Sequence, residues 1–229
     1  MRPVKKVALL HDLCGVGKAA LTNMVPVLSV MGIEACPIPT ILLSTHTGGY
    51  GKPAMEKIST TYIRECADHY VANQVTFDLI FVGYLGSEGM IEAVEYFLSC
   101  FPDTEVIIDP IMGDHGRYYT NFDSSYGESM RRLLPYASII MPNITEGCLL
   151  TQTSCSENMI QETILTICQD LEKAGAKKIV MTSVPCASGR KGIVLYENGE
   201  MQPSFRKSAL PVNTTEPGIR LTVYLWGHI

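Results

Sequence analysis

The sequence predicts an α/β fold in which a mainly parallel central sheet lies between two layers of helices, a three-layer α/β/α sandwich. Short apolar runs alternate along the chain with segments of helical spacing. The runs are nearly continuous in Val, Ile and Leu, as in strands buried on both faces, and the helices between them require crossovers that make neighbouring strands parallel. The chain has 229 residues, of which 46% are hydrophobic. One large core is therefore expected, in a single domain over residues 1–229.

The predicted elements follow one another in a regular order. An apolar run at residues 7–10 predicts the first strand, a glycine-containing loop follows, and residues 18–31 show helical spacing. The same alternation predicts strands at residues 41–43, 78–84, 105–109, 138–141 and 177–182, and helices at residues 87–100, 124–134 and 157–174. Residues 192–196 and 201–205 flank Asn198-Gly199, a pair typical of a tight antiparallel hairpin.

Composition and charge narrow the class of function. A net charge of -5 without a basic run argues against a nucleic-acid partner, since nucleic-acid binders display a concentrated basic face. No apolar stretch approaches the roughly 18 to 20 residues that span a bilayer, and no signal-peptide pattern is seen, so we expect a cytoplasmic protein without a membrane partner. The eight cysteines are scattered without a C-x-x-C pair, which disfavours a zinc site.

Polar side chains follow the predicted strands. In an open parallel sheet, ligands bind outside the carboxyl ends of the strands. These positions hold His11, Asp12, residues 44–49, Tyr84, Asp109, Asp114, Asn143, Glu146, Thr182 and Ser183. We therefore expect a binding site along this edge of the sheet.

The glycine loop after the first strand fits neither common phosphate-binding motif. Gly15 is too far from the strand for a dinucleotide fingerprint, and Ala19 replaces the Ser or Thr that holds magnesium in a Walker motif. The simpler interpretation is a turn whose glycines, Gly15 and Gly17, permit tight packing against a bound molecule.

Two carboxylates indicate a magnesium–nucleotide site. Asp109 ends a buried strand, where an unpaired carboxylate is costly, and Pro110 fixes the chain as it leaves the sheet. Glu146, after the next strand, would add an oxygen ligand of the kind that Mg²⁺ prefers. A second interpretation, compatible with the first, is that Asn143 caps a helix with Glu146 as its capping-box partner.

Four motifs together resemble pyridoxal kinases of the ribokinase-like superfamily: GYLGS at residues 83–87, DPIMGD at 109–114, PNITE at 142–146 and STHTGGYG at 44–51. The resemblance covers residues 4–210. It implies ATP-dependent phosphorylation of the 5′-hydroxymethyl group of pyridoxal, pyridoxine or pyridoxamine, with Mg²⁺, a monovalent cation such as K⁺, and a homodimer. Hydroxymethylpyrimidine kinases of thiamine synthesis share the DP and PN-x-x-E motifs and are the alternative family.

The resemblance also implies roles for individual residues. It places Asp12, His46, Thr47 and Tyr84 around the vitamin ring, with Asp12 where many relatives have serine. It implies that the nucleotide is bound by Asp109, Asn143, Glu146, Thr182 and Ser183. Asp109 and Glu146 would also bind magnesium. Residues 114–122 resemble the flap that closes over ATP.

The tail departs from the family pattern over residues 213–229. The family carries a G-T-G-D motif whose aspartate takes the hydroxyl proton, whereas residues 215–220 read TEPGIR and no aspartate follows Asp170. We therefore assign no catalytic residue and expect the usual C-terminal helices to be missing. Three hypotheses follow: a kinase in which another group such as Glu216 acts as base, an inactive nucleotide- or vitamin-binding pseudo-kinase, or a changed reading frame near Asn213.

Overall fold

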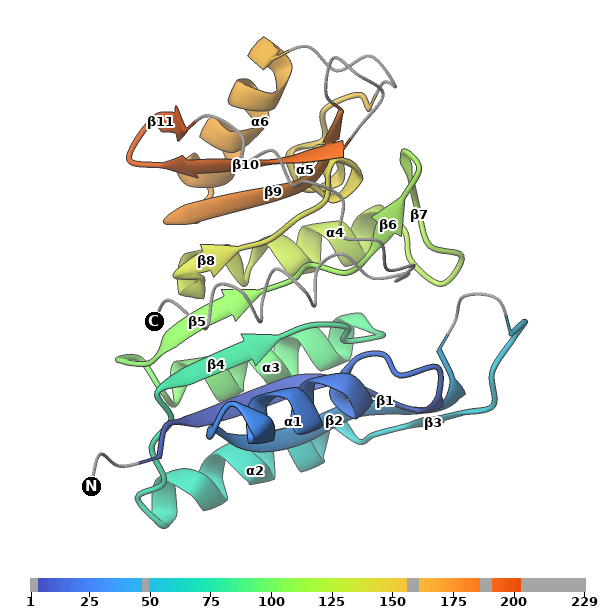
Figure 1. Ribbon diagram of the computed structural model, residues 1–229, viewed down its shortest axis with the longest axis vertical. Coiled ribbons are helices and arrows are strands. Elements are labelled where there is room, and N and C mark those ends of the chain that lie inside the picture. Colours follow the sequence, from blue (N-terminus) through green and yellow to red (C-terminus); the bar gives the residue numbers. More distant parts are fainter. Residues whose placement is uncertain (1–3, 47–49, 156–160, 186–190, 203–229) are drawn as a thin grey trace. The chain divides into compact units, whose positions relative to one another are not determined.

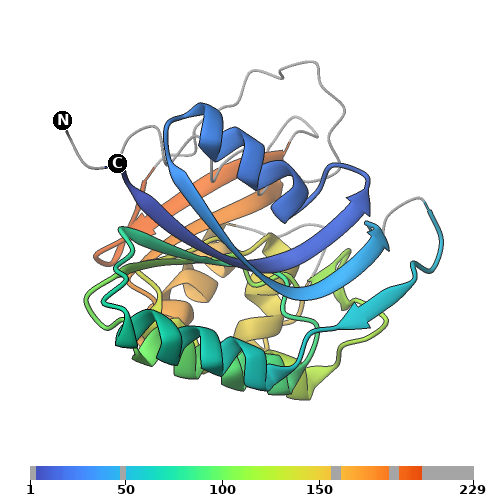
Figure 2. The same cartoon turned by 90° about the horizontal axis from the view of Figure 1, so that it is seen from below.

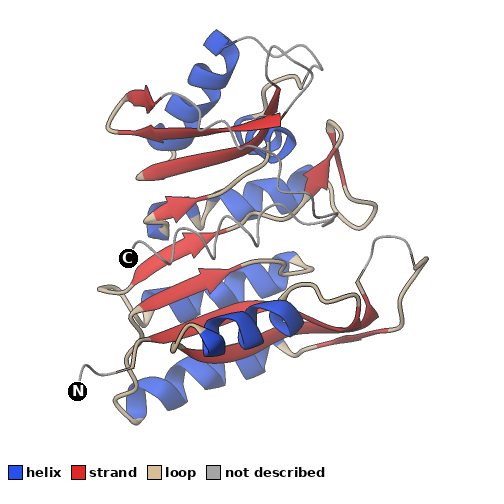
Figure 3. Cartoon of the chain, viewed as in Figure 1, coloured by secondary structure: helices blue, strands red, loops and turns tan. Residues whose placement is uncertain are grey.

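The structure is a computed structural model that describes residues 4–46, 50–155, 161–185 and 191–202. The predicted fold class is confirmed, because helices alternate with the strands of a large, mainly parallel sheet (Figure 3). Contacts within the chain define two compact units that meet in the sequence at Val106 and Ile107. The single domain stays a prediction.

The first unit contains four strands in the order β3-β2-β1-β4 (Figure 1). The parallel strands are β1 (Lys6–Val16), β2 (Glu34–Thr45) and β4 (Leu79–Val82), and β3 (Met55–Lys57) runs antiparallel to β2. The loop expected after residue 10 is instead strand, because β1 continues to pair with β2 as far as Val16.

Helices cover both faces of this first sheet. α1 (Leu21–Val30) lies on one face, and α2 (Thr60–Ala72) and α3 (Glu88–Ser99) lie side by side on the other (Figure 2). Ser87 caps α3 through a hydrogen bond from the Met90 N–H, which explains where that predicted helix begins. The sequence did not predict α2, whose buried side chains are Ile63 and Ala67 and form only a narrow apolar stripe.

The second unit continues the same architecture. Its parallel strands are β5 (Glu105–Ile108), β8 (Ile139–Ile140) and β9 (Lys178–Pro185), followed by β10 (Lys191–Glu197) and β11 (Glu200–Gln202), which are antiparallel to their neighbours. Asn198 and Gly199 have φ values of 54° and 80°, as a tight hairpin turn requires. The predicted hairpin is therefore confirmed for the part of its second strand that the structure describes.

Helix α5 is central to the second unit, where it packs against α4, α6 and β9. The helical segments of this unit are α4 (Ser124–Arg131), the 3₁₀ turn η1 (Leu134–Tyr136), α5 (Ile144–Thr151) and α6 (Gln161–Lys173). A small hairpin, β6 (Gly113–Asp114) and β7 (Arg117–Tyr118), lies beside α5. Among the described residues, none of the helices is long and apolar enough to cross a membrane.

Candidate functional site

Asp12 lies in β1 as a buried carboxylate beside a buried imidazole. Asp12 is 7% exposed and His11 is 3% exposed. Nδ1 of His11 lies 2.8 Å from Asp12 Oδ1 and also 2.8 Å from the Asp12 backbone nitrogen. A proton on Nδ1 is donated to the carboxylate, whereas an unprotonated Nδ1 accepts from the backbone N–H. The hydrogen bond in the structure is the second of these, with the Asp12 backbone N–H donating to His11 Nδ1.

A bulge in the neighbouring strand connects this region to Tyr84. Across β1 and β2, His11 pairs with Pro39 and Leu13 with Leu42, so Thr40 and Ile41 together oppose Asp12. The Thr40 hydroxyl donates a hydrogen bond of 2.7 Å to the Tyr84 carbonyl. Tyr84 packs against an apolar cluster that includes Ile41. The strand end therefore orients Tyr84 through its backbone and its ring together.

His46 occupies the far end of β2 beside the glycine turn. Its backbone N–H donates to the Val16 carbonyl at 3.0 Å, and its ring meets that of Tyr50 edge to face at 5.1 Å. Gly17 has a φ of 116°, and a Cβ there would overlap the His46 ring. The glycine thus allows tight packing against His46 of the same chain. Thr47, expected at the vitamin ring, lies outside the described residues.

Three polar residues meet at one edge of the second unit. Ile108 pairs with Ile140, which pairs with Ile179, so β5, β8 and β9 end side by side. Beyond these ends, Asn143 forms a parallel bridge with Thr182, and the Thr182 N–H donates to the Pro142 carbonyl at 2.8 Å. Asp109 directly follows β5. The structure therefore brings Asp109, Asn143 and Thr182 to a common edge, as predicted.

Ser183 lies in a bulge of β9. Met181 pairs with Val194 and Val184 with Gly192, so Thr182 and Ser183 together oppose Ile193. Ser183 has a φ of 58°, in the left-handed region that non-glycine residues rarely adopt. Bulges of this kind redirect side chains at strand ends, which places two hydroxyl groups at this edge.

The capping box at the start of α5 engages both Asn143 and Glu146. Asn143 Oδ1 accepts from the Glu146 N–H at 2.9 Å, and Glu146 Oε2 accepts from the Asn143 N–H at 2.8 Å. The other Glu146 oxygen accepts from the Met112 N–H at 3.3 Å, and Asn143 Nδ2 donates to the Gly113 carbonyl at 2.9 Å. The capping interpretation is therefore confirmed, and these two side chains also hold the DPIMGD turn.

Burial and a neighbouring charge raise the pKa of Glu146. Its residue is 3% exposed, and burial raises its pKa well above the ordinary range, with the Asp109 carboxylate raising it further. Backbone N–H groups of Asn143, Met112 and Gly113 act in the opposite direction. Two carboxylates that repel each other at a strand end favour a cation between or near them.

The donor set fits Mg²⁺ held in part by water. Both Glu146 oxygens already accept from backbone N–H groups. Asp109 is partly exposed and is the better direct ligand. Across the described residues, no three His, Cys, Asp or Glu side chains cluster closely enough to hold a metal alone. Mg²⁺ commonly binds through one or two carboxylates together with phosphate and water, which is what these residues allow.

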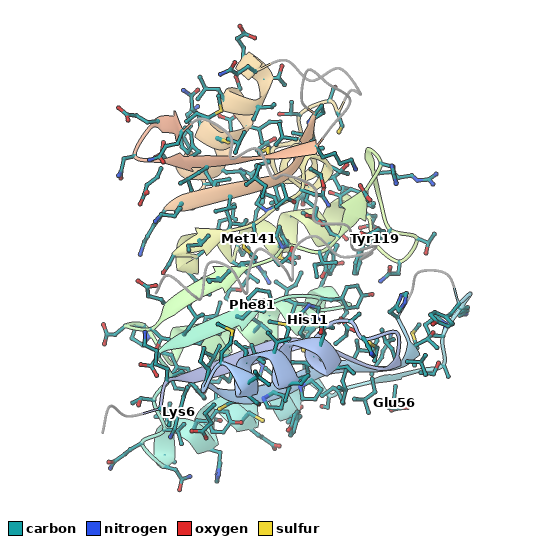
Figure 4. The ribbon with its side chains drawn as sticks, in the orientation of Figure 1. Lys6, His11, Glu56, Phe81, Tyr119 and Met141 are labelled. Atoms are coloured by element: carbon teal, nitrogen blue, oxygen red, sulfur yellow. The ribbon has the colours of Figure 1, made fainter. Side chains whose placement is uncertain are left out.

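The expected flap is anchored at its turn by the same helix start. The Gly116 N–H donates to Thr145 Oγ1 at 3.0 Å, and the Tyr119 N–H donates to the Met112 carbonyl at 3.0 Å. A Cβ on Gly127 would overlap the Tyr118 hydroxyl, so α4 also packs closely on this hairpin. Tyr119, labelled in Figure 4, is 40% exposed. The turn of the hairpin is thus tied to Thr145, and its base is closed between Tyr119 and Met112.

Sequence reasoning missed three residues of these two edges. His11 was noted as polar but given no role, and Thr40 and Thr145 were not noted. Their contacts depend on a bulge and on a helix start whose partners are distant in sequence.

Comparisons with known proteins identify relatives over most of the chain. The phosphomethylpyrimidine kinase family matches residues 25–216. The crystal structure of a pyridoxal kinase from Lactobacillus plantarum is 30% identical, with a TM-score of 0.86, and the match covers 99% of this chain and 80% of that one. A putative phosphomethylpyrimidine kinase from Bacteroides thetaiotaomicron, crystallised with pyridoxal, is 35% identical, with a TM-score of 0.79, covering 85% of this chain and 69% of that one.

A pyridoxal kinase from Arabidopsis thaliana is 26% identical over 162 residues, which are 69% of this chain and 51% of that protein. The chain therefore matches about half the length of this relative. The family resemblance drawn from the motifs is confirmed.

Proposed function

The chain belongs to the pyridoxal kinase family of the ribokinase-like superfamily, and from this premise we propose that it binds Mg-ATP and a B6 vitamer for transfer of the γ-phosphoryl group to the 5′-hydroxymethyl oxygen. The observation that carries the proposal is the strand-end edge of the second unit. There Asp109, the capping box of Asn143 and Glu146, and Thr182 come together at the start of α5.

This edge suits a nucleotide phosphate chain with its metal. Asp109 supplies a partly exposed carboxylate for Mg²⁺, and the hydroxyl groups of Thr182 and Ser183 supply hydrogen bonds for phosphate oxygens. Glu146 and Asn143 act chiefly by fixing the backbone of Met112 and Gly113. Bound Mg²⁺ would neutralise phosphate charge and, together with K⁺, complete the proposed ligand set.

The edge of the first unit suits the vitamin. Asp12, Tyr84 and His46 offer a carboxylate and two aromatic rings at the ends of β1, β4 and β2, and Thr47 is proposed to join them. Positioning and charge neutralisation supply most of the catalysis in phosphoryl transfer, so binding residues carry much of the proposed activity.

A pseudo-kinase is the second candidate, and the TEPGIR segment at residues 215–220 favours it. Calorimetry with pyridoxal, pyridoxine, pyridoxamine, hydroxymethylpyrimidine and Mg-ATP, beside a phosphotransfer assay, separates the alternatives. Binding of a B6 vitamer with transfer supports the kinase, and binding without transfer supports the pseudo-kinase. Preference for hydroxymethylpyrimidine would overturn the proposed substrate.

We further propose a cytoplasmic homodimer formed through the first unit. Leu13, Leu42 and Met55 are 39%, 36% and 48% exposed, unusual for large apolar side chains on neighbouring strands. Sedimentation analysis of Leu42→Glu beside the unmodified chain tests this. A dimer that persists unchanged in the variant would contradict the assigned surface.

A further inference from the structure

The hairpin of β6 and β7, which begins the expected flap, is too short to hold its own position. Each of its strands has two residues, and an isolated hairpin is at best marginally stable in water. Its turn is defined locally, because His115 and Gly116 have φ values of 53° and 74°, as a type I′ turn requires. The Asp114 carboxylate also accepts from the His115 N–H at 2.8 Å. These contacts shape the turn, but its place depends on the rest of the second unit.

The start of α5 supplies the contacts that place the hairpin (Figure 1). Asn143 Nδ2 donates to the Gly113 carbonyl at 2.9 Å, and Thr145 Oγ1 accepts from the Gly116 N–H at 3.0 Å. The first hydrogen bond holds β6, and the second holds the turn that leads to β7. The first turn of α5 therefore fixes both the DPIMGD segment and the turn of the flap.

Thr145 is buried, whereas the turn that it holds is exposed. Thr145 is 2% exposed, and a buried hydroxyl group is costly unless it has a hydrogen-bond partner. The partner here is the N–H of Gly116, a residue 29 positions earlier in the chain. Beside this hydrogen bond, a Cβ on Gly116 would lie 3.9 Å from the Cβ of Cys155. The turn is thus docked on α5 by a polar contact with a packing contact next to it.

We propose that Thr145 is a positioning residue for the nucleotide, whose hydroxyl group docks the flap on α5 before Mg-ATP binds. The inference rests on the function proposed above and deepens it. Asn143, which we assign to the nucleotide, lies in the same helical start as Thr145, so the docked flap keeps a fixed place beside the nucleotide edge. A nucleotide that meets a docked flap does not have to order it, and its affinity is higher for that reason.

Three variants isolate the contribution of the hydroxyl group. Thr145→Val replaces it by a methyl group of similar size, so the Gly116 N–H loses its acceptor while the space stays filled. Thr145→Ser keeps the hydroxyl group and tests rescue. Thr151→Val is the matched control, because the Thr151 hydroxyl donates to the Gly147 carbonyl at 2.9 Å and lies at the other end of the same helix.

Limited trypsin digestion without nucleotide tests the docking, with mass spectrometry to locate the cuts. Arg117 is exposed in β7, and cleavage there reports how often the hairpin opens. Thr145→Val should be cut at Arg117 about three- to tenfold faster than the unmodified chain, the factor expected for one hydrogen bond. Thr145→Ser and Thr151→Val should be cut at the unmodified rate. If Thr145→Val does not fold, Thr145→Ala removes the same acceptor.

Calorimetry and digestion with Mg-ATP test the role in nucleotide binding. Thr145→Val should bind Mg-ATP about two- to tenfold more weakly, because the nucleotide must then dock the flap itself. Bound Mg-ATP should slow the cleavage of this variant at Arg117 to the rate of the unmodified chain. Thr145→Ser and Thr151→Val should keep the unmodified affinity.

The two levels of the proposal fail differently. If the unmodified chain binds no Mg-ATP, the proposed function is overturned and the nucleotide role of Thr145 with it, while digestion without nucleotide still decides the docking. Equal cleavage of Thr145→Val and the unmodified chain would overturn the docking. Equally fast cleavage of Thr145→Val and Thr151→Val would also overturn it, because a weakened α5 would then explain the opening. Faster cleavage of Thr145→Val with unchanged Mg-ATP affinity would overturn the positioning role alone.

Discussion

The first unit places a buried carboxylate, that of Asp12, beside the His11 ring, whereas the second unit holds one, that of Glu146, through backbone N–H groups. Asp12 Oδ1 lies 2.8 Å from His11 Nδ1, which accepts a hydrogen bond from the Asp12 backbone N–H. Glu146 accepts backbone N–H groups at both oxygens. Two carboxylates that look alike in the sequence, each near a strand end, are thus prepared for different tasks. We propose that Asp12 serves a ligand, whereas Glu146 fixes the DPIMGD turn through the Met112 N–H.

The largest expected effect concerns turnover, because residues 213–229 contain no aspartate to match that of the family's G-T-G-D motif. We expect the unmodified chain to show little or no phosphotransfer and to retain some ligand affinity. Replacing residues 213–229 by a family segment with the G-T-G-D motif and its helix should raise kcat by about 10² to 10⁴. Assays must use protein free of host kinase. Equal turnover by both chains would show that another group, such as Glu216, acts as base.

Removing the backbone-bound carboxylate should be the most destabilising point substitution. Glu146→Ala leaves the N–H groups of Asn143 and Met112 without their partner, at a cost of about 1 to 3 kcal/mol each. Urea denaturation should show a loss of about 2 to 5 kcal/mol. The matched control is Glu162→Ala, an exposed acid in the first turn of α6, which should change stability by less than about 0.5 kcal/mol. Similar losses in both variants would contradict the structural role.

Substitution in the glycine turn should have the next largest effect. Gly17→Ala combines a φ of 116° with overlap against His46, and should destabilise by about 1 to 3 kcal/mol. Gly32→Ala is the control, because Gly32 has a φ of 77° but nothing within 4 Å of an added Cβ, so it reports backbone strain alone. Thermal denaturation of the two variants separates the cost of overlap with His46 from the cost of backbone strain. Equal melting temperatures would show that the His46 ring yields without cost.

The smallest expected effect is a pH dependence that belongs to the second unit. The raised pKa of Glu146 means that the folded chain still binds a proton at pH values where the unfolded chain has released it. The free energy of unfolding therefore falls as pH rises between the ordinary pKa of glutamate and the raised folded value, by about 1.4 kcal/mol per pH unit at most. Asp109→Asn removes the charge that raises the pKa of Glu146, so the pH range over which stability falls should become narrower.

Denaturation in urea across this range measures the slope, with Asp103→Asn, an exposed acid of the other unit, as the control. An identical pH profile in Asp109→Asn and the unmodified chain would show that the two carboxyl groups are not coupled.

The fold was largely predictable because the spacing of hydrophobic residues indicates most of its strands and helices. The apolar strand before Asp109 and the helix that begins after Ser87 could be predicted without knowing which elements they pack against. Helix α2 was missed because its apolar stripe is narrow. The extension of β1 to Val16 was missed because pairing with β2, rather than local sequence, makes it a strand.

The candidate site was predictable at the level of strand ends but not of contacts. The rule that ligands bind at carboxyl ends selected Asp109, Asn143 and Thr182, which the structure brings to one edge. It could not show that both Glu146 oxygens are committed to backbone N–H groups. Nor could it show that Thr40 reaches the Tyr84 carbonyl, since this contact joins residues 44 positions apart.

Calorimetry of two variants against two ligands tests the central claim most directly. The claim is that Asp12 serves the vitamin and Asp109 serves the nucleotide. Asp12→Asn should weaken pyridoxal binding about tenfold and leave Mg-ATP binding nearly unchanged, and Asp109→Ala should do the reverse, with Asp103→Asn altering neither. Equal loss of both ligands in either variant would contradict the division of roles and indicate misfolding instead.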